Sequence, residues 1–226
     1  MIIKSADYII SSPDYTQCPK ADRPEYAFIG RSNVGKSSLI NMLCNNSKLA
    51  KISSTPGKTQ LINHFAVESV PEGPTPALPI REGVRKTYRP PNEGVQWYLV
   101  DLPGYGFAKV AQSARNRWQQ MIENYLRKRE NLVNVFVLID SRHDPQKADL
   151  DFINKLGDWQ VPFCLVFTKA DKETQKEVSK NVKAFLDAMR LHWQFLPQHF
   201  VTSAIKKLGR DKILHFVQEC NTKFVV

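Results

Sequence analysis

Eight residues near the N-terminus constrain this chain more than any other stretch. Residues 30–37 read G-R-S-N-V-G-K-S and fit the pattern G-x-x-x-x-G-K-[ST]. An apolar run, Tyr26–Ile29, precedes them, and Leu39, Ile40 and Leu43 follow at helical spacing. A strand, a glycine-rich loop and a helix in this order bind phosphate, because the loop N–H groups and the helix N-terminus point at one anion. The pattern therefore predicts a nucleoside triphosphate site.

Every residue of this loop is a candidate nucleotide contact. Lys36 is expected to reach the β- and γ-phosphates, and the Ser37 hydroxyl is expected to bind Mg²⁺. The alternative is a glycine turn beside a surface lysine, and the flanking strand and helix argue against it. The candidate contacts are Gly30, Arg31, Ser32, Asn33, Val34, Gly35, Lys36 and Ser37.

Apolar runs alternate with amphipathic segments along the rest of the chain. The predicted strands after the loop are Val95–Val100, Leu132–Ile139 and Val161–Phe167. The predicted helices are Ser113–Arg129, Lys147–Leu156, Thr174–Met189 and Asp211–Val225. This alternation predicts an α/β fold of three layers, with a mostly parallel sheet and helices on both faces. Ligands of such sheets bind beyond the carboxyl ends of the strands.

The predicted organisation is one nucleotide-binding domain, 25–226, after an N-terminal segment, 1–24. This segment contains Pro13, Pro19 and Pro24 and reads as a strand or an arm. From residue 70 to residue 94 the chain has six prolines and three glycines. Such a composition excludes a helix and disfavours a central strand, so we expect a long insertion in a hairpin connection.

A second motif, Thr168-Lys169-Ala170-Asp171, follows a predicted strand and fits [NT]-K-x-D. The Asp171 carboxylate can accept hydrogen bonds from N1–H and the exocyclic amino group of guanine, a pair that adenine lacks. Adenine would leave the carboxylate unpaired, which favours guanine strongly. Lys169 is expected to lie over the phosphate loop by its aliphatic stem. The segment Thr202-Ser203-Ala204 resembles the last base-contacting loop of proteins that bind guanine nucleotides through an [NT]-K-x-D motif.

A third motif, Asp101-Leu102-Pro103-Gly104, also follows a predicted strand and fits D-x-x-G. Asp101 is expected to hold Mg²⁺ through a water molecule, and the Gly104 N–H to sense the γ-phosphate. An ordinary Pro-Gly turn is the alternative. The order of the three motifs along the chain favours the nucleotide site.

Charge and composition limit the classes of partner that this protein is expected to bind. The 226 residues include 32 Lys and Arg against 22 Asp and Glu, a net charge of +10 that favours a polyanion such as RNA or DNA. We find no secretory signal and no apolar run of the roughly 18 to 20 residues that span a bilayer, so we expect a cytoplasmic protein without a membrane partner. The cysteine and histidine spacings suggest neither zinc nor a disulfide framework.

With these motifs in order, the sequence resembles the EngB (YihA/YsxC) family of bacterial ribosome-assembly GTPases, of the TrmE-Era-EngA-EngB-Septin-like class. The stretches Thr55-Pro56-Gly57-Lys58-Thr59-Gln60 and Asp101-Leu102-Pro103-Gly104-Tyr105-Gly106-Phe107-Ala108 add to the resemblance. It implies a Ras-like domain that hydrolyses GTP to GDP, with Mg²⁺, in assembly of the large ribosomal subunit, with effects on cell division and septation. The long insertion departs from the family.

The resemblance also implies contacts in a first switch loop. Thr59 would close over Mg²⁺ and the γ-phosphate, although Thr55 is available in the same loop. The nucleotide contacts implied there are Gly57, Lys58, Thr59, Gln60 and Leu61.

Catalysis is expected to be slow. Tyr105 stands where Ras-like enzymes carry a glutamine that orients the attacking water. As a hypothesis, Asn33 holds a K⁺ ion that stabilises charge, as related GTPases with this asparagine imply; an asparagine that only stabilises the loop is the alternative. The groups assigned to catalysis are Lys36, Thr59, Gly104 and Asn33.

Two basic segments are candidate rRNA contacts, though solvated helix faces are the simpler interpretation. One comprises Arg115, Arg117, Arg127, Lys128 and Arg129, with Trp118 and Tyr125 interleaved, and the other comprises Lys206, Lys207, Arg210 and Lys212. The expected partners are GTP or GDP and the large ribosomal subunit or its precursor, bound by a monomer. The alternatives are an RNA-binding protein that uses nucleotide structurally, and a GTPase that acts directly in cell division.

Overall fold

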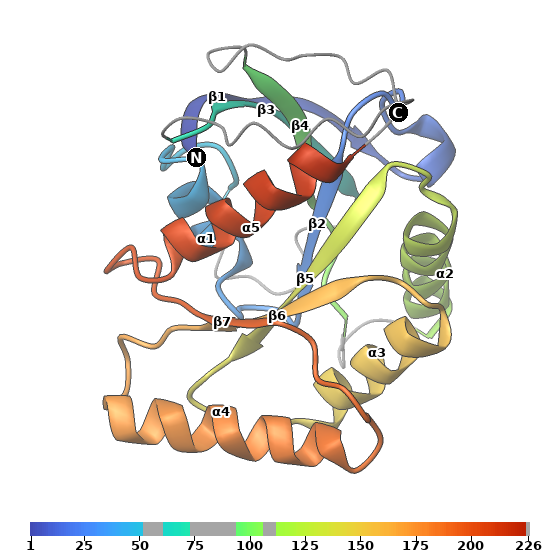
Figure 1. Cartoon of the computed structure of the whole chain (residues 1–226). Helices are drawn as coiled ribbons and strands as arrows, with labels where there is room; N and C mark the ends of the chain where they lie inside the picture. Colours follow the sequence, from blue (N-terminus) through green and yellow to red (C-terminus); the bar gives the residue numbers. More distant parts are fainter. Residues whose placement is uncertain (52–60, 73–93, 106–111, 225–226) are drawn as a thin grey trace, which may run out of the picture.

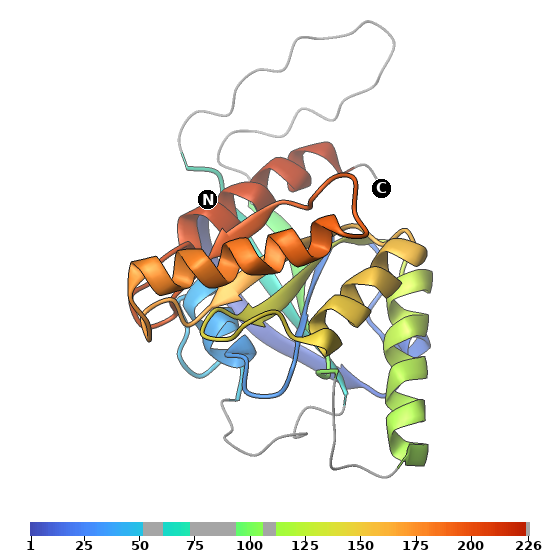
Figure 2. The same ribbon diagram turned by 90° about the horizontal axis from the view of Figure 1, so that it is seen from below.

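The computed structural model describes residues 1–51, 61–72, 94–105 and 112–224. Within them, seven strands form one sheet in the order β1-β3-β4-β2-β5-β6-β7, with helices on both faces (Figures 1 and 2). The strands are β1 Ile2–Ser12, β2 Glu25–Gly30, β3 Ile62–Val70, β4 Val95–Asp101, β5 Leu132–Asp140, β6 Phe163–Thr168 and β7 His199–Val201. The helices are α1 Lys36–Leu43, α2 Gln112–Lys128, α3 Lys147–Asp158, α4 Gln175–Arg190 and α5 Arg210–Lys223, with a 3₁₀ turn at Tyr15–Gln17. The predicted three-layer α/β fold is confirmed.

The middle of the sheet is parallel, as the buried apolar runs predict. β2 pairs in parallel with both β4 and β5, and β6 pairs in parallel with β5 and β7. Every residue of β2 is buried, since helices cover both of its faces. Strands β3 and β7 lie outside the apolar runs that predict strands in the sequence. β3 contains two polar pairs that interrupt its apolar residues, and β7 has only three residues, so neither shows the continuous apolar run that marked the others.

The N-terminal segment joins the sheet. β1 pairs antiparallel with β3, from Ile2 opposite Val70 to Ser12 opposite Ile62, and so forms one edge. β3 and β4 are also antiparallel neighbours, with Ser69 opposite Val95. The proline-rich insertion therefore connects a hairpin, and its residues 73–93 lie outside the described residues.

A hydrophobic core lies on each face of the sheet. Helices α2, α3 and α4 cover one core, to which Tyr125, Ile153 and Phe185 belong. Helices α1 and α5 cover the other, where Phe28 stacks on Phe136 with 4.8 Å between ring centroids. The two layers hold the strand ends in place, and all the motifs follow the carboxyl ends of β2, β4, β6 and β7. No helix in the described ranges is long and apolar enough to cross a membrane.

Candidate nucleotide-binding site

The glycine-rich loop turns sharply between β2 and α1. A Cβ on Gly30 would lie 2.8 Å from the carbonyl oxygen of Leu138 on β5, so only glycine fits there. Gly35 immediately precedes α1 with φ +101°, a backbone conformation that glycine adopts without strain. The N-cap residue of α1 is this glycine, which has no side chain to cap the helix, and the first N–H groups of such a helix suit an anion. The loop thus has the geometry of a phosphate cradle.

Lys36 and Asp101 meet beside this loop. β2 and β4 are in register with Phe28 opposite Asp101, which places the end of β4 next to the loop. The ammonium of Lys36 contacts the Asp101 carboxylate, and both side chains are largely buried. Burial lowers the pKa of Lys36 to about 7. A cation in such a desolvated position attracts an anion strongly.

The D-x-x-G turn packs directly against the phosphate loop. A Cβ on Gly104 would lie 2.5 Å from the Gly30 carbonyl oxygen and 3.5 Å from the Ser32 backbone nitrogen. The turn is tied to β2 as well, because the Leu102 N–H donates to the Phe28 carbonyl at 3.0 Å. The backbone of residue 104 therefore lies at the phosphate end of the site.

The T-K-x-D loop is bonded to the same phosphate loop. The Thr168 hydroxyl donates to the Val34 carbonyl at 2.6 Å, and the Lys169 ammonium donates to the Asn33 carbonyl, also at 2.6 Å. Lys169 has φ +62° and its stem passes Gly35, as expected from the sequence. Two motifs separated by more than a hundred residues thus form one unit.

Asp140, at the end of β5, completes this unit and was not identified from the sequence. Its carboxylate accepts from Lys169 at 2.8 Å and from Arg142 at 2.7 Å. Although burial opposes the charge, these two cations hold the pKa of Asp140 well below its usual range. The acid therefore stays ionised and fixes the Lys169 side chain across the loop.

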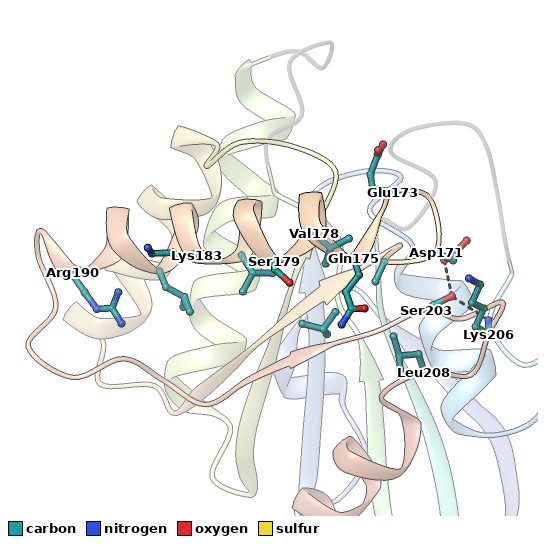
Figure 3. Close-up of a pocket in the computed structure, with 14 residues that line it drawn as sticks. Asp171, Glu173, Gln175, Val178, Ser179, Lys183, Arg190, Ser203, Lys206 and Leu208 are labelled. Atoms are coloured by element: carbon teal, nitrogen blue, oxygen red, sulfur yellow. Dashed lines mark hydrogen bonds between the residues drawn. The ribbon is translucent and has the colours of Figure 1, made fainter.

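Asp171 and Ser203 meet at the other end of the site. The Ser203 hydroxyl donates to the Asp171 carboxylate at 2.6 Å, which lowers the pKa of this acid (Figure 3). The Ala170 N–H donates to the Thr202 carbonyl at 3.1 Å, so the two segments that are expected to contact the base lie side by side. A cavity of about 780 Å³ extends from Asp171 and Ser203 along α4 toward Arg190.

The donor set at the phosphate end suits Mg²⁺. Ser37 lies in the first turn of α1, immediately after Lys36, whose ammonium contacts the Asp101 carboxylate. A hydroxyl and a carboxylate are the hard oxygen ligands that Mg²⁺ takes together with substrate phosphates. No cluster of three or more His, Cys, Asp or Glu that could hold a metal occurs in the part of the chain that the structure describes.

The first switch loop falls almost wholly outside the described residues. Leu61, which is 38% exposed, is described. Gly57, Lys58, Thr59 and Gln60 lie outside, as does Thr55.

Arg31 extends away from the phosphate loop toward α3. Its guanidinium donates to Asp149 at 3.1 Å, and the Tyr105 hydroxyl donates to the same carboxylate oxygen at 3.0 Å. Sequence reasoning missed Asp149, because an acid in the first turn of a helix is ordinarily solvated and only favours the helix dipole. The side chain of Arg31 is therefore engaged with α3, and the candidate nucleotide contact at this position is the backbone of Arg31.

Only some of the basic side chains in the two candidate rRNA-contact segments are exposed. Arg129 is buried against Glu25, and Arg210 donates to the carbonyls of Met42 and Leu43 at the end of α1. These two guanidinium groups are therefore engaged in contacts within the fold. Tyr125 is fully buried as well. The exposed basic side chains that remain are Arg117, Arg127, Lys128, Lys206, Lys207 and Lys212.

A glycine-rich loop, a D-x-x-G turn packed on it and a T-K-x-D loop bonded to it define a P-loop GTPase on this sheet. A family model described as the 50S ribosome-binding GTPase matches residues 25–169. The chain is 47% identical over 222 residues to the "Probable GTP-binding protein EngB" of Flavobacterium psychrophilum, covering 98% of this chain and 96% of the relative. It is also 47% identical, over 221 residues, to the protein of that name from Phocaeicola vulgatus, covering 98% of each. The chain belongs to the EngB family of GTP-hydrolysing proteins.

Solved structures agree on the fold. Era of Aquifex aeolicus bound to GDP and aluminium fluoride gives a TM-score of 0.61 at 21% identity, over 87% of this chain and 56% of Era. The crystal structure of a probable GTP-binding protein EngB gives a TM-score of 0.56 at 19% identity, over 88% of this chain and 100% of that one. At these identities the likeness concerns the fold alone, and the near full-length relatives carry the family assignment.

Proposed function

We propose that this GTPase is a molecular switch that binds the large ribosomal subunit, or its precursor, during assembly. The observation that carries the proposal is the match of residues 25–169 to the 50S ribosome-binding GTPase family. The net charge of +10 supports a partner rich in RNA. Era, a neighbour in fold of which this chain covers 56%, has been crystallised in complex with MgGDPNP and nucleotides 1506–1542 of 16S ribosomal RNA. Effects on cell division would follow indirectly from impaired subunit assembly.

Within this proposal the phosphate loop holds the β- and γ-phosphates. Lys36 would move from Asp101 onto the phosphates, because the buried ammonium finds more negative charge there. Gly104 would donate its N–H to the γ-phosphate from its position against Gly30. Asp171 would accept the guanine N–H groups while Ser203 holds it in place.

We further propose that Ser37, Thr59 and Asp101 hold Mg²⁺, Asp101 through a water molecule. Bound there, Mg²⁺ would neutralise charge that develops on the phosphate oxygens. Asn33 is the proposed K⁺ ligand; its φ of +61° and the bond from Lys169 to its carbonyl fix its backbone at the phosphate loop. The protein would act in the cytoplasm as a monomer.

Cosedimentation with purified large subunits tests the proposal. The protein is incubated with GDP, a non-hydrolysable GTP analogue or ATP at one fixed salt concentration. Pelleting that requires the GTP analogue is the expected result. Equal pelleting in all three samples would show an RNA-binding protein whose affinity for the subunit does not depend on the nucleotide. An absence of pelleting would show that the large subunit is not the partner.

Lys36→Met should abolish nucleotide-dependent pelleting. Its matched control is Lys183→Met, on the exposed face of α4, which should leave pelleting unchanged. Loss of pelleting in both variants would indicate that net charge alone attracts the particle.

A further inference from the structure

Three segments distant in sequence converge on the carboxylate of Asp149. Arg31 comes from the phosphate loop, Tyr105 follows the D-x-x-G turn, and Asp149 lies in the first turn of α3. The Arg31 Nε and the Tyr105 hydroxyl both donate to Oδ1 of Asp149, at 3.1 Å and 3.0 Å. One acid thereby bridges the two loops that surround the terminal phosphate.

The environment of this acid makes the bridge strong. Only 1% of the Asp149 side chain is exposed, and its second oxygen, Oδ2, has no hydrogen-bond donor among the described residues. Burial raises the pKa of Asp149, and the Arg31 guanidinium and the Tyr105 hydroxyl oppose that effect. Removal of either donor would leave a poorly solvated carboxylate, which costs far more than a surface ion pair.

Tyr105 is held by its ring as well as by its hydroxyl. The ring stacks on Phe152, one turn further along α3, with 4.2 Å between centroids and 15° between planes. Burial and the Asp149 carboxylate raise the pKa of Tyr105 well above its ordinary value, so the hydroxyl remains a donor. The side chain is thus fixed to α3, and the backbone of its neighbour Gly104 is fixed against Gly30.

We infer that Asp149 is a positioning residue that locks Tyr105 and Arg31 together and so holds the Gly104 N–H where a γ-phosphate would accept it. The inference rests on the proposed role of Gly104 in the site. GDP has no γ-phosphate, so its affinity should not depend on this bridge. A GTP analogue should depend on it, because each displacement of residue 104 weakens one hydrogen bond to the terminal phosphate.

Asp149→Asn tests the inference, because asparagine keeps the shape but loses the charge that holds Arg31. Affinities for GDP and for a non-hydrolysable GTP analogue are measured with fluorescent nucleotides, together with kcat and KM for GTP. We expect the affinity for the GTP analogue to fall by about 5- to 10-fold, the size of a typical coupling between sites, and the affinity for GDP to change by less than about two-fold. Equal losses for both nucleotides, or no loss, would overturn the inference.

Two further variants keep the test decisive. Tyr105→Phe keeps the stack on Phe152 and removes only the hydroxyl, so it should lower the affinity for the GTP analogue in the same selective way even if Asp149→Asn fails to fold. In a folded Asp149→Asn background the tyrosine change should add little, because both act through one contact. Full additivity would contradict a shared role.

Asp151→Asn is the matched control, since it removes the same charge from an exposed position of α3, where Asp151 pairs with Lys147. It should leave both affinities unchanged. Failure of the wild-type protein to bind the GTP analogue at all would count against the proposed function, whereas normal binding with no selective loss in the variants would count against Asp149 alone.

Discussion

The ammonium of Lys169 donates to the Asn33 carbonyl oxygen at 2.6 Å, so the loop that would read the base is bonded to the loop that would hold the phosphates. Asp140 holds the same ammonium from the other side, at 2.8 Å. Because Asn33 has a φ of +61°, which residues other than glycine adopt at a cost, contacts from outside the loop help to hold its conformation. Lys169 supplies that support, which couples recognition of guanine to the shape of the phosphate cradle.

Lys169→Met should therefore weaken both GDP and GTP binding. The variant keeps the aliphatic stem beside Gly35 and loses two charge-assisted hydrogen bonds, so we expect a loss on the order of 10- to 100-fold in affinity. Equilibrium titration with a fluorescent guanine nucleotide measures it. Lys176→Met, at an exposed position of α4, is the control and should bind normally. Unchanged affinity in Lys169→Met would show that the loop holds its shape unaided.

Asp171→Asn should change which base is accepted. Asparagine offers one donor where the carboxylate offers only acceptors, so guanine loses one of its two hydrogen bonds and meets an N–H in its place. We expect GTP affinity to fall by about 30-fold or more, and xanthosine triphosphate, which has a carbonyl in place of the amino group, to bind better than GTP. Competition titrations with the two nucleotides give the ratio, and an unchanged preference for GTP would exclude Asp171 from base recognition.

Gly104→Ala should impair GTP hydrolysis but not GDP binding, because of a steric clash. The new Cβ would meet the Gly30 carbonyl oxygen at 2.5 Å, which forces the D-x-x-G turn away from the phosphate loop. We expect GTP hydrolysis to drop at least about 10-fold while GDP binding is retained, because GDP does not reach this turn. Phosphate release under saturating GTP measures the first quantity. A variant with normal turnover would show that residue 104 stays clear of the reacting phosphate.

The local motifs were predictable from the sequence, and the long-range contacts were not. Residues 30–37 and 168–171 carry their geometry in short patterns, because glycine freedom, a helix start and a strand end are local properties. The bond between Arg31 and Asp149 joins residues 118 positions apart. Nothing in either neighbourhood distinguishes this acid from a solvated one, because its burial depends on how α3 packs against the sheet.

The basic run Arg127-Lys128-Arg129 at the end of α2 is a second case in which the local sequence does not reveal which side chain is buried. The sequence of this run indicates a solvated face, yet the side chain of Arg129 is 8% exposed and its guanidinium donates to Glu25 at 2.9 Å. Arg127, two positions earlier, instead pairs at the surface with Glu123. Which cation turns inward follows from how α2 packs on the sheet, where Tyr125 contacts Glu25 of β2 and His64 of β3.

The buried carboxylate of Glu25 provides a prediction about stability and pH. It accepts hydrogen bonds from Arg129, Asn131 and Tyr125, and His64 lies 3.2 Å away. Burial opposes ionisation, but His64 and Arg129 outweigh it and lower the pKa of Glu25 from 4.5 to about 2. Because the folded-state pKa is the lower one, this stabilisation is present above about pH 4.5 and is lost as the pH falls toward 2.

Glu25→Gln should therefore lower the free energy of unfolding by about 3 kcal/mol at pH 7, the equivalent of the pKa difference. The difference from wild type should shrink between pH 4.5 and pH 2, where the wild-type carboxylate takes up its proton. Urea unfolding at pH 7, 4 and 3 measures both effects. Glu130→Gln, an exposed acid near the end of α2, should change the free energy little at any of these values. A constant difference across this pH range would mean that packing around residue 25, rather than its charge, stabilises the contact between α2 and the sheet.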